Sequence, residues 1–157
     1  MWYSSTMIRT DEHAYLRIGK DIKTGKIPGL VVLHGEEQYL VDFYVSALVK
    51  KYVSEASKSL DFAELDRESL TVDEVIENLE TVSILSERKV VIIRDFIDAK
   101  GRLPKKLDQK GSGSKDALEA FLGYADNMPD GALLILTAAK QEDTRAASRR
   151  AYSALVG

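Results

Sequence analysis

The stretch "VVLHGEEQYLVD", positions 31–42, has the outline of a phosphate-binding loop. An aliphatic run ends at Gly35 and a helix-forming segment follows, which is where nucleotide-binding domains place the backbone N–H groups that hold phosphate. The full pattern G-x-x-x-x-G-K-[ST] also needs glycine, lysine and Ser/Thr at positions 40 to 42. The chain has Leu40, Val41 and Asp42 there, and these side chains supply neither positive charge nor a hydroxyl. The stretch therefore predicts the strand-to-helix turn of a nucleotide-binding fold without the residues that bind nucleotide.

Acidic and hydroxyl side chains at the ends of the expected strands allow a second chemistry, phosphoryl transfer to an aspartate. Glu36 and Glu37 follow the first aliphatic run, Asp95 follows "VVIIR", and Thr137 and Lys140 follow the last run. Because the carboxyl ends of parallel strands meet at one edge of a sheet, these groups would converge there, as in a receiver-type Mg²⁺-dependent phosphoacceptor. Such sites prefer aspartates, and a glutamate displaces its carboxylate by one methylene. Charged residues at strand ends are also the usual solvated boundary of an α/β domain, so both interpretations stay open.

Composition limits the other classes of site. The chain has 157 residues, is 45% apolar and 30% charged, and carries a net charge of −3, which is typical of one globular domain with no general attraction to nucleic acid or membrane. It has no cysteine, and its two histidines, His13 and His34, are too far apart in sequence to suggest a metal cluster. We therefore expect no metal and no cofactor. The basic stretches "RLPKKLDQK" and "DTRAASRRAY" signal DNA binding only weakly, because each also contains an aspartate.

No segment predicts a membrane span or a leader. The longest aliphatic run, "ALLILTAA", is far too short to cross a bilayer, and "MWYSSTMIRT" lacks the charged-then-apolar plan of a signal peptide. A cytoplasmic location is the expectation that follows by default.

Hydrophobic periodicity predicts strands that alternate with helices. The expected strands are "PGLVVLHG", "LDFAELD", "KVVIIRD" and "GALLILTA". The expected helices cover residues 11–23, 36–54, a segment that begins with the capping box "TVDE" at 71–74, residues 116–128 and residues 143–156. Because the strands are too apolar to have a solvated face, the pattern predicts a three-layer α/β fold, a parallel sheet with helices on both faces.

The domain organisation predicted is simple. Residues 1–10 are expected to be an N-terminal extension and residues 11–157 one domain. The segment from Lys100 to Lys115 is polar and rich in Gly and Ser, so from about Gly101 onward it should be a mobile surface loop. The last expected helix reaches the end of the sequence without a cap, which suggests a piece of a longer protein.

Two adjacent aliphatic residues, Ile84 and Leu85, are hard to place in the core. The helix that begins at Thr71 has an apolar face made of Val72, Val75, Ile76, Leu79 and Val82. At about 100° per residue, the pair would lie roughly 120–140° from the centre of that face. If the helix ends earlier, the pair lies in the turn "SILSER" before the next strand. The pair either packs locally under that turn or is exposed as an anchor for a protein partner.

Three stretches together resemble the N-terminal domain of the bacterial DNA polymerase III delta subunit. They are "LVVLHGEEQYLVDFYVSALVKKYV", "LDFAELDRESLTVDEVIENLETVSILSERKVVIIRDF" and "LLILTAAK". The distinctive features are their order, Gly-Glu-Glu after the first strand, Glu-Leu-Asp after the second, and the apolar pair before Ser-x-Arg. The resemblance runs from about Ala14 to Leu155, nearly the whole chain.

This resemblance implies an AAA+-type fold without a working phosphate loop, in a non-catalytic subunit of the clamp loader. The family's delta subunit does not bind ATP and opens the ring-shaped sliding clamp, the beta subunit. It reaches DNA through the complex with the gamma/tau and delta prime subunits, and its lid and collar domains are missing here.

The clamp contact that the resemblance implies is Ile84 and Leu85, flanked by Ser83 and Ser86. The family often has an aromatic at the second position, and Leu85 departs from that. The alternatives are the receiver-type domain with Asp95 and a degenerate phosphate-loop scaffold that binds another protein.

Overall fold

The computed structural model describes residues 5–9, 12–35, 37–107 and 114–140. Their centre is a five-stranded sheet of order β1-β2-β5-β4-β3, in which every neighbouring pair is parallel. The strands are β1 (Ser5–Arg9), β2 (Leu30–His34), β3 (Phe62–Leu65), β4 (Lys89–Ile97) and β5 (Ala132–Ala138). The helices are α1 (Glu12–Thr24), α2 (Gln38–Tyr52), the 3-10 turn η1 (Glu55–Ser57), α3 (Lys58–Asp61), α4 (Val72–Glu80) and α5 (Ser114–Asp126). The predicted three-layer α/β fold is confirmed.

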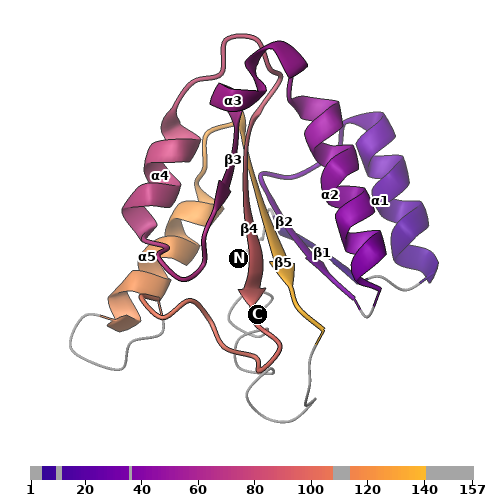
Figure 1. Cartoon of the computed structure of the whole chain (residues 1–157). Coiled ribbons are helices and arrows are strands. Elements are labelled where there is room, and N and C mark those ends of the chain that lie inside the picture. Colours follow the sequence, from indigo (N-terminus) through magenta and orange to yellow (C-terminus); the bar gives the residue numbers. More distant parts are fainter. Residues whose placement is uncertain (1–4, 10–11, 36, 108–113, 141–157) are drawn as a thin grey trace.

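Helices cover both faces of the sheet, with α1 and α2 on one side and α4 and α5 on the other (Figure 1). The reason is visible in the strands, whose successive side chains point to opposite faces. In β5, Leu134 and Leu136 pack with the α4 and α5 side, whereas Leu133 and Ile135 pack with the α1 and α2 side. A strand that is apolar on both faces can be buried only between two layers of helices.

The predicted order of strands and helices holds, with one strand added. Residues 1–10 were expected to be an extension, but β1 lies within them and pairs with β2 from Ser5 opposite Leu30 to Arg9 opposite His34. The stretch "STMIR" mixes polar and apolar residues and lacks the continuous aliphatic run of a central strand. An edge strand pairs on one side only and needs no such run, which is why periodicity did not reveal it.

The buried face of α2 differs in part from the one that helical spacing predicts, which consists of Leu40, Phe43, Tyr44, Ala47 and Leu48. The buried residues are Val41, Val45, Leu48 and Tyr52, spaced three and four apart, whereas Phe43 is exposed. The amphipathic pattern of this helix is ambiguous because apolar residues occur almost all round it. Contact with the sheet, and not the pattern, decides which stripe is buried.

The expected loop from Lys100 to Lys115 is partly wrong. Leu103 and Leu107 are buried against the α4 and α5 side of the core, so residues 101–107 pack on the domain although they form neither helix nor strand. Residues 108–113 lie outside the described residues, as does the expected helix over 143–156. Beyond this segment, Phe121 of α5 stacks on Phe96 of β4 with ring centroids 5.1 Å apart, which fixes α5 to the sheet. No helix in the described ranges is long and apolar enough to cross a bilayer.

Candidate protein-binding site

The two ends of the sheet carry the two kinds of candidate site. The turns after β2, β4 and β5 lie at the carboxyl edge, where the arrowheads of Figure 1 point. The turn before β4 lies at the opposite, amino edge. A nucleotide or phosphoacceptor site would be at the carboxyl edge, since ligands of parallel α/β sheets bind outside the carboxyl ends of the strands. The apolar pair is at the other end.

At the carboxyl edge, the phosphate-loop position holds an ion pair. Gly35 follows β2, and α2 begins at Gln38. Asp42 stands where a phosphate loop has the Ser/Thr that binds Mg²⁺, and its Oδ1 lies 2.7 Å from an Nη atom of Arg94. The Nε atom of Arg94 also pairs with Glu64 at 3.0 Å. A carboxylate already paired with an arginine occupies the place of the missing hydroxyl, so this turn has the shape of a phosphate loop but not its chemistry.

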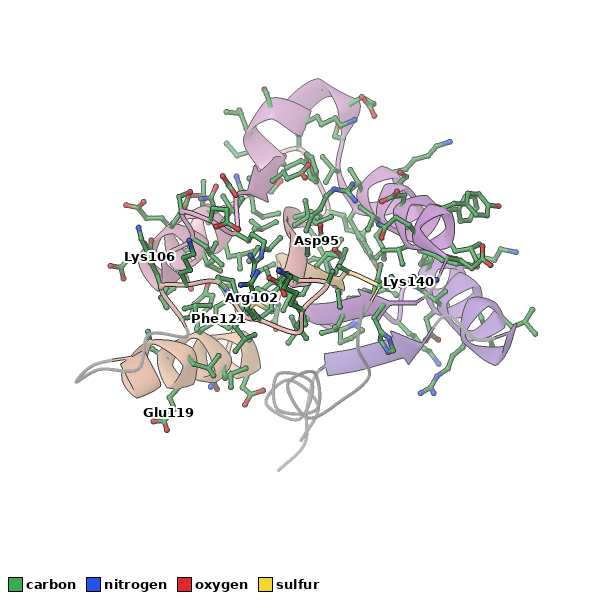
Figure 2. All side chains as sticks on the ribbon, turned by 60° about the horizontal axis from the view of Figure 1, so that its bottom comes forward. Asp95, Arg102, Lys106, Glu119, Phe121 and Lys140 are labelled. Atoms are coloured by element: carbon green, nitrogen blue, oxygen red, sulfur yellow. The ribbon has the colours of Figure 1, made fainter. Side chains whose placement is uncertain are left out.

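The phosphoacceptor candidates are only partly brought together. Asp95 is exposed and lies in an irregularity of β4 with a positive φ of 50°. The Oγ1 atom of Thr137 accepts the backbone N–H of Asp95 at 2.9 Å, which links the end of β5 to the irregularity of β4. Figure 2 turns this edge toward the reader and shows Asp95 and Lys140 on it. Glu37 is the N-cap residue that precedes α2, and Glu36 lies outside the described residues. Within the part of the chain that the structure describes, no group of three or more His, Cys, Asp and Glu side chains could hold a metal ion.

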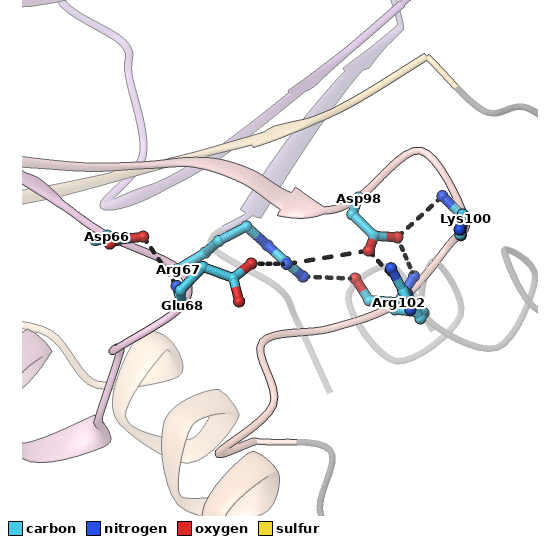
Figure 3. Close-up of polar contacts among 6 residues, drawn as sticks. All are labelled: Asp66, Arg67, Glu68, Asp98, Lys100 and Arg102. Atoms are coloured by element: carbon cyan, nitrogen blue, oxygen red, sulfur yellow. Dashed lines mark hydrogen bonds and ion pairs between the residues drawn. The ribbon is translucent and has the colours of Figure 1, made fainter.

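A further acid at this edge, Asp98, holds two turns together (Figure 3). Its carboxylate accepts the backbone N–H of Lys100 at 2.9 Å and of Arg102 at 2.8 Å, and it pairs with Nε of Arg102 at 2.9 Å. Arg67, from the turn after β3, lies 4.0 Å from the same carboxylate and donates to the Arg102 carbonyl at 3.0 Å. Burial acts to raise the pKa of Asp98, but the hydrogen bonds from Arg102 and Lys100 outweigh it and hold that pKa below its ordinary value. Its role is structural.

At the amino edge, α4 ends before the apolar pair. Thr71 caps its start by accepting the Glu74 N–H at 3.2 Å, as the sequence predicts. The helix ends at Glu80, because Thr81 is extended, and the Thr81 hydroxyl donates to the Glu77 carbonyl at 2.9 Å. Residues 81–88 then form an arch over the amino edge before β4 (Figure 1). We call this segment the display turn.

The display turn exposes three large aliphatic side chains. Ile84 is 91% exposed, Leu85 63% and Val82 83%. The sequence predicted Val82 on the apolar face of α4. This is wrong, because the helix ends at Glu80 and Val82 lies in the turn that follows. The other exposed large hydrophobic residues among those described are scattered over α1, α2 and α3. Among the described residues, residues 82–85 are the only stretch of four that exposes three large hydrophobic side chains.

The backbone of the display turn is nevertheless well bonded. The Ser83 hydroxyl accepts the Ser86 N–H at 3.0 Å and donates to the Ser86 carbonyl at 3.1 Å. The N–H groups of Glu87 and Arg88 both donate to the Tyr52 carbonyl, at 3.0 and 3.2 Å. Arg88 stacks its guanidinium over the Tyr52 ring, 4.6 Å from the centroid. The turn thus presents apolar side chains outward from a backbone that is tied to the end of α2.

Comparison with known proteins places the chain in a family. The family model described as DNA polymerase III, delta subunit, matches residues 32–152, which is well over half of the chain. The chain belongs to this family. The DNA polymerase III subunit delta of Bacillus subtilis (strain 168) is 27% identical over 105 residues, which are 67% of this chain and 29% of that protein. The chain therefore spans less than a third of the length of this delta-subunit relative.

A solved structure shows that the fold is shared as well. The Bacillus subtilis DNA clamp loader delta protein superposes with a TM-score of 0.63, at 21% identity, over 88% of this chain and 39% of the other. The delta-subunit chain thus has the AAA+-like α/β fold of a clamp loader delta protein. This is the fold expected for a phosphate-loop domain that lacks its phosphate-binding residues.

Sequence reasoning found Ile84 and Leu85 but missed Val82 as part of the exposed set. The available signal was the run Thr81-Val82-Ser83, since β-branched residues and serine are poor helix formers and compete with helical hydrogen bonds. Read in that way, the run predicts the end of α4 near Glu80. The ion pair between Asp42 and Arg94 had no sequence signal, because the two residues meet only when α2 packs beside β4.

The carboxyl edge should bind no nucleotide. Position 41 lacks the lysine that neutralises phosphate and position 42 lacks the Ser/Thr that binds Mg²⁺. We expect a calorimetric titration of the chain with Mg-ATP or Mg-ADP to show no binding, and a phosphate-release assay to show no hydrolysis. Micromolar binding in the titration would contradict this prediction.

Asp98 predicts how stability depends on pH. Its pKa is lower in the folded chain than in the unfolded one, where it is about 3.9, so its stabilisation is complete above that pH and is lost as the pH falls through the folded-state value. We expect Asp98→Asn to lower the free energy of unfolding at neutral pH, and this difference to shrink as the pH falls below about 4. Urea denaturation at several pH values measures it. The control is Asp130→Asn at an exposed position, and a difference for Asp98→Asn that stays constant with pH would contradict the prediction.

Proposed function

We propose that this chain is the sliding-clamp-binding module of a replicative clamp loader and has no catalytic activity of its own. The docking surface is the display turn, with Ile84 and Leu85 as anchors and Ser83 and Ser86 beside them. The observation that carries the proposal is the exposure of these two adjacent aliphatic side chains on a hydrogen-bonded turn. Apolar anchors that enter a pocket on a partner supply most of the binding energy in many protein interfaces.

Val82 extends the proposed docking surface. It precedes Ser83 and is exposed to a similar degree as Ile84. The turn between Val82 and Leu85 is too short to hide three aliphatic side chains under itself, so a partner is the natural place for them to be buried. Since residues 82–85 carry no charged side chain, their own contribution to the association should depend little on salt.

The wider setting of the proposal comes from the family. A delta subunit acts in DNA replication as part of the DNA polymerase III complex, and we propose the same for the protein that contains this chain. Contacts with the gamma/tau and delta prime subunits, and contact with DNA through the complex, would then involve parts of the protein outside this chain. The absence of the phosphate-binding residues at positions 40–42 supports a non-catalytic role.

Truncating both anchors should abolish most of the affinity for the clamp. Burying an aliphatic side chain is worth about 1.5–3 kcal/mol, so the pair supplies roughly 3–6 kcal/mol before ordering costs. At about 1.4 kcal/mol per factor of ten, Ile84→Ala/Leu85→Ala should weaken binding to the organism's sliding clamp by at least about a hundredfold. Surface plasmon resonance or calorimetry with the purified clamp measures this.

The same double change should leave the fold intact. Because both side chains are exposed, the free energy of unfolding should change by less than about 1 kcal/mol, whereas Leu79→Ala in the buried face of α4 should lower it by about 2–5 kcal/mol. If the double variant melts the domain while its folded fraction binds the clamp normally, the pair is part of the core and the proposed site is wrong.

The phosphoacceptor alternative is tested separately. Incubation of the chain with Mg²⁺ and acetyl phosphate, followed by intact-mass measurement, should leave the mass unchanged, because the described residues contain no cluster of side chains that could hold the Mg²⁺. A phosphate adduct located on Asp95 would favour the receiver-type function over the proposed one.

A further inference from the structure

A buried polar cluster lies directly beneath the display turn. Asp61, the last residue of α3, and Ser57, the last residue of η1, are each only 4% exposed. The Ser57 hydroxyl donates to Oδ2 of Asp61 at 2.5 Å, and its oxygen lies 3.0 Å from the hydroxyl oxygen of Ser86. The backbone N–H of Ser54 donates to the same Ser86 hydroxyl at 2.9 Å. Ser86, next to the anchor Leu85, is thereby bonded to a segment about thirty residues earlier in the chain.

The hydrogen bonds in this cluster run in one direction. A serine hydroxyl has a single hydrogen, and that of Ser57 is directed at the carboxylate. The hydrogen between the two hydroxyls must then come from Ser86. The result is a chain of donors that starts at the Ser54 N–H, passes through Ser86 and Ser57, and ends on the Asp61 carboxylate. We call these four residues the serine relay.

The negative charge of Asp61 makes the serine relay strong. The hydroxyl of Ser57, and after it that of Ser86, lowers the pKa of the Asp61 carboxyl against the opposing effect of burial, so the group stays ionised at neutral pH. The charged groups that face it include Lys89 at the start of β4, whose buried ammonium donates to the Leu60 carbonyl of α3. Hydrogen bonds to an ionised acceptor in a poorly solvated place are shorter and stronger than neutral ones.

A fixed backbone matters for this particular surface. An exposed turn with large aliphatic side chains lowers its free energy by packing them onto the neighbouring protein surface unless the backbone prevents it. Any freedom of the turn must also be lost when a partner binds, and that loss weakens binding. The serine relay ties the turn at Ser86, one residue after Leu85, and the bonds from Glu87 and Arg88 to the Tyr52 carbonyl continue the attachment.

We propose that Asp61 and Ser57 are positioning residues for partner docking, which hold the display turn in its binding conformation through Ser86 without touching the partner. This inference rests on the proposed docking function of Ile84 and Leu85. Because Asp61 and Ser57 are buried, an effect of changing them on binding cannot come from a lost contact with the partner. That burial separates a positioning role from a contact role.

The test uses Asp61→Asn and Ser57→Ala in the 157-residue chain, with Ser59→Ala as the matched control at an exposed serine of α3. Amide hydrogen exchange of the chain alone should show faster exchange at Ser86, Glu87 and Arg88 in both relay variants, by about tenfold, which is the factor expected for the loss of a charge-assisted hydrogen bond. Binding to the organism's purified sliding clamp should weaken by a similar factor. Ser59→Ala should change neither quantity. Ser57→Ala removes only a hydroxyl group. If Asp61→Asn unfolds the chain, the exchange and binding measurements on Ser57→Ala still decide the question.

Two results would overturn the inference. Unchanged exchange at residues 86–88 would show that the serine relay does not hold the turn, and faster exchange with unchanged clamp affinity would show that holding it does not matter for docking. Failure of the docking proposal itself has a different signature. In that case Ile84→Ala/Leu85→Ala leaves clamp binding intact, whereas the relay variants still loosen the turn in the exchange measurement.

Discussion

Parallel pairing of β5 between β2 and β4 is the constraint from which the rest of the molecule follows. β5 is buried along its whole length and has helices on both faces, so its neighbours must be joined to it by crossovers that run over the sheet. Each crossover returns the chain to the amino edge, and every strand ends at the carboxyl edge. The connecting segments therefore lie in two groups at opposite ends of the domain, and the two groups can carry different kinds of side chain and different binding sites.

The carboxyl and amino edges of the sheet carry opposite distributions of polar and apolar side chains. At the carboxyl edge, where a nucleotide-binding relative would hold phosphate, charged groups satisfy one another. Asp42 pairs with Arg94, Thr137 bonds the Asp95 backbone, and Asp98 holds its own turn. At the amino edge the polar groups lie inside and the apolar ones outside, which is the reverse of normal burial. An edge in which polar side chains are buried to support exposed aliphatic ones is consistent with a surface made for a partner.

Buried polar side chains beneath exposed aliphatic ones are stable only if the polar groups make their hydrogen bonds. Buried polar atoms are tolerated when their hydrogen bonds are made, and in the serine relay the Asp61 carboxylate provides the acceptor that ends the chain of donors. Tyr52 serves a related purpose, because its carbonyl accepts two backbone N–H groups of the display turn while its ring lies under Arg88. The end of α2, α3 and the start of β4 thus form one support, and the display turn rests on it.

Local patterns were sufficient for much of this molecule. Continuous aliphatic runs identified the three inner strands β2, β4 and β5, the stretch 60–66 located the edge strand β3, and the Thr71 cap located the start of α4. Aliphatic runs and helix caps depend on residues close together in the chain. The missing phosphate-loop residues at positions 40–42 and the poor fit of Ile84 and Leu85 to the helix face were also visible in the sequence.

Other features could not be predicted from the sequence, since each depends on which surface lies opposite. They are the edge strand β1, the buried stripe of α2 and the burial of Leu103 and Leu107. The bond between Ser86 and Ser57 belongs to the same class. It arises only when segments about thirty residues apart are packed together, and hydrophobic periodicity carries no information about such pairs.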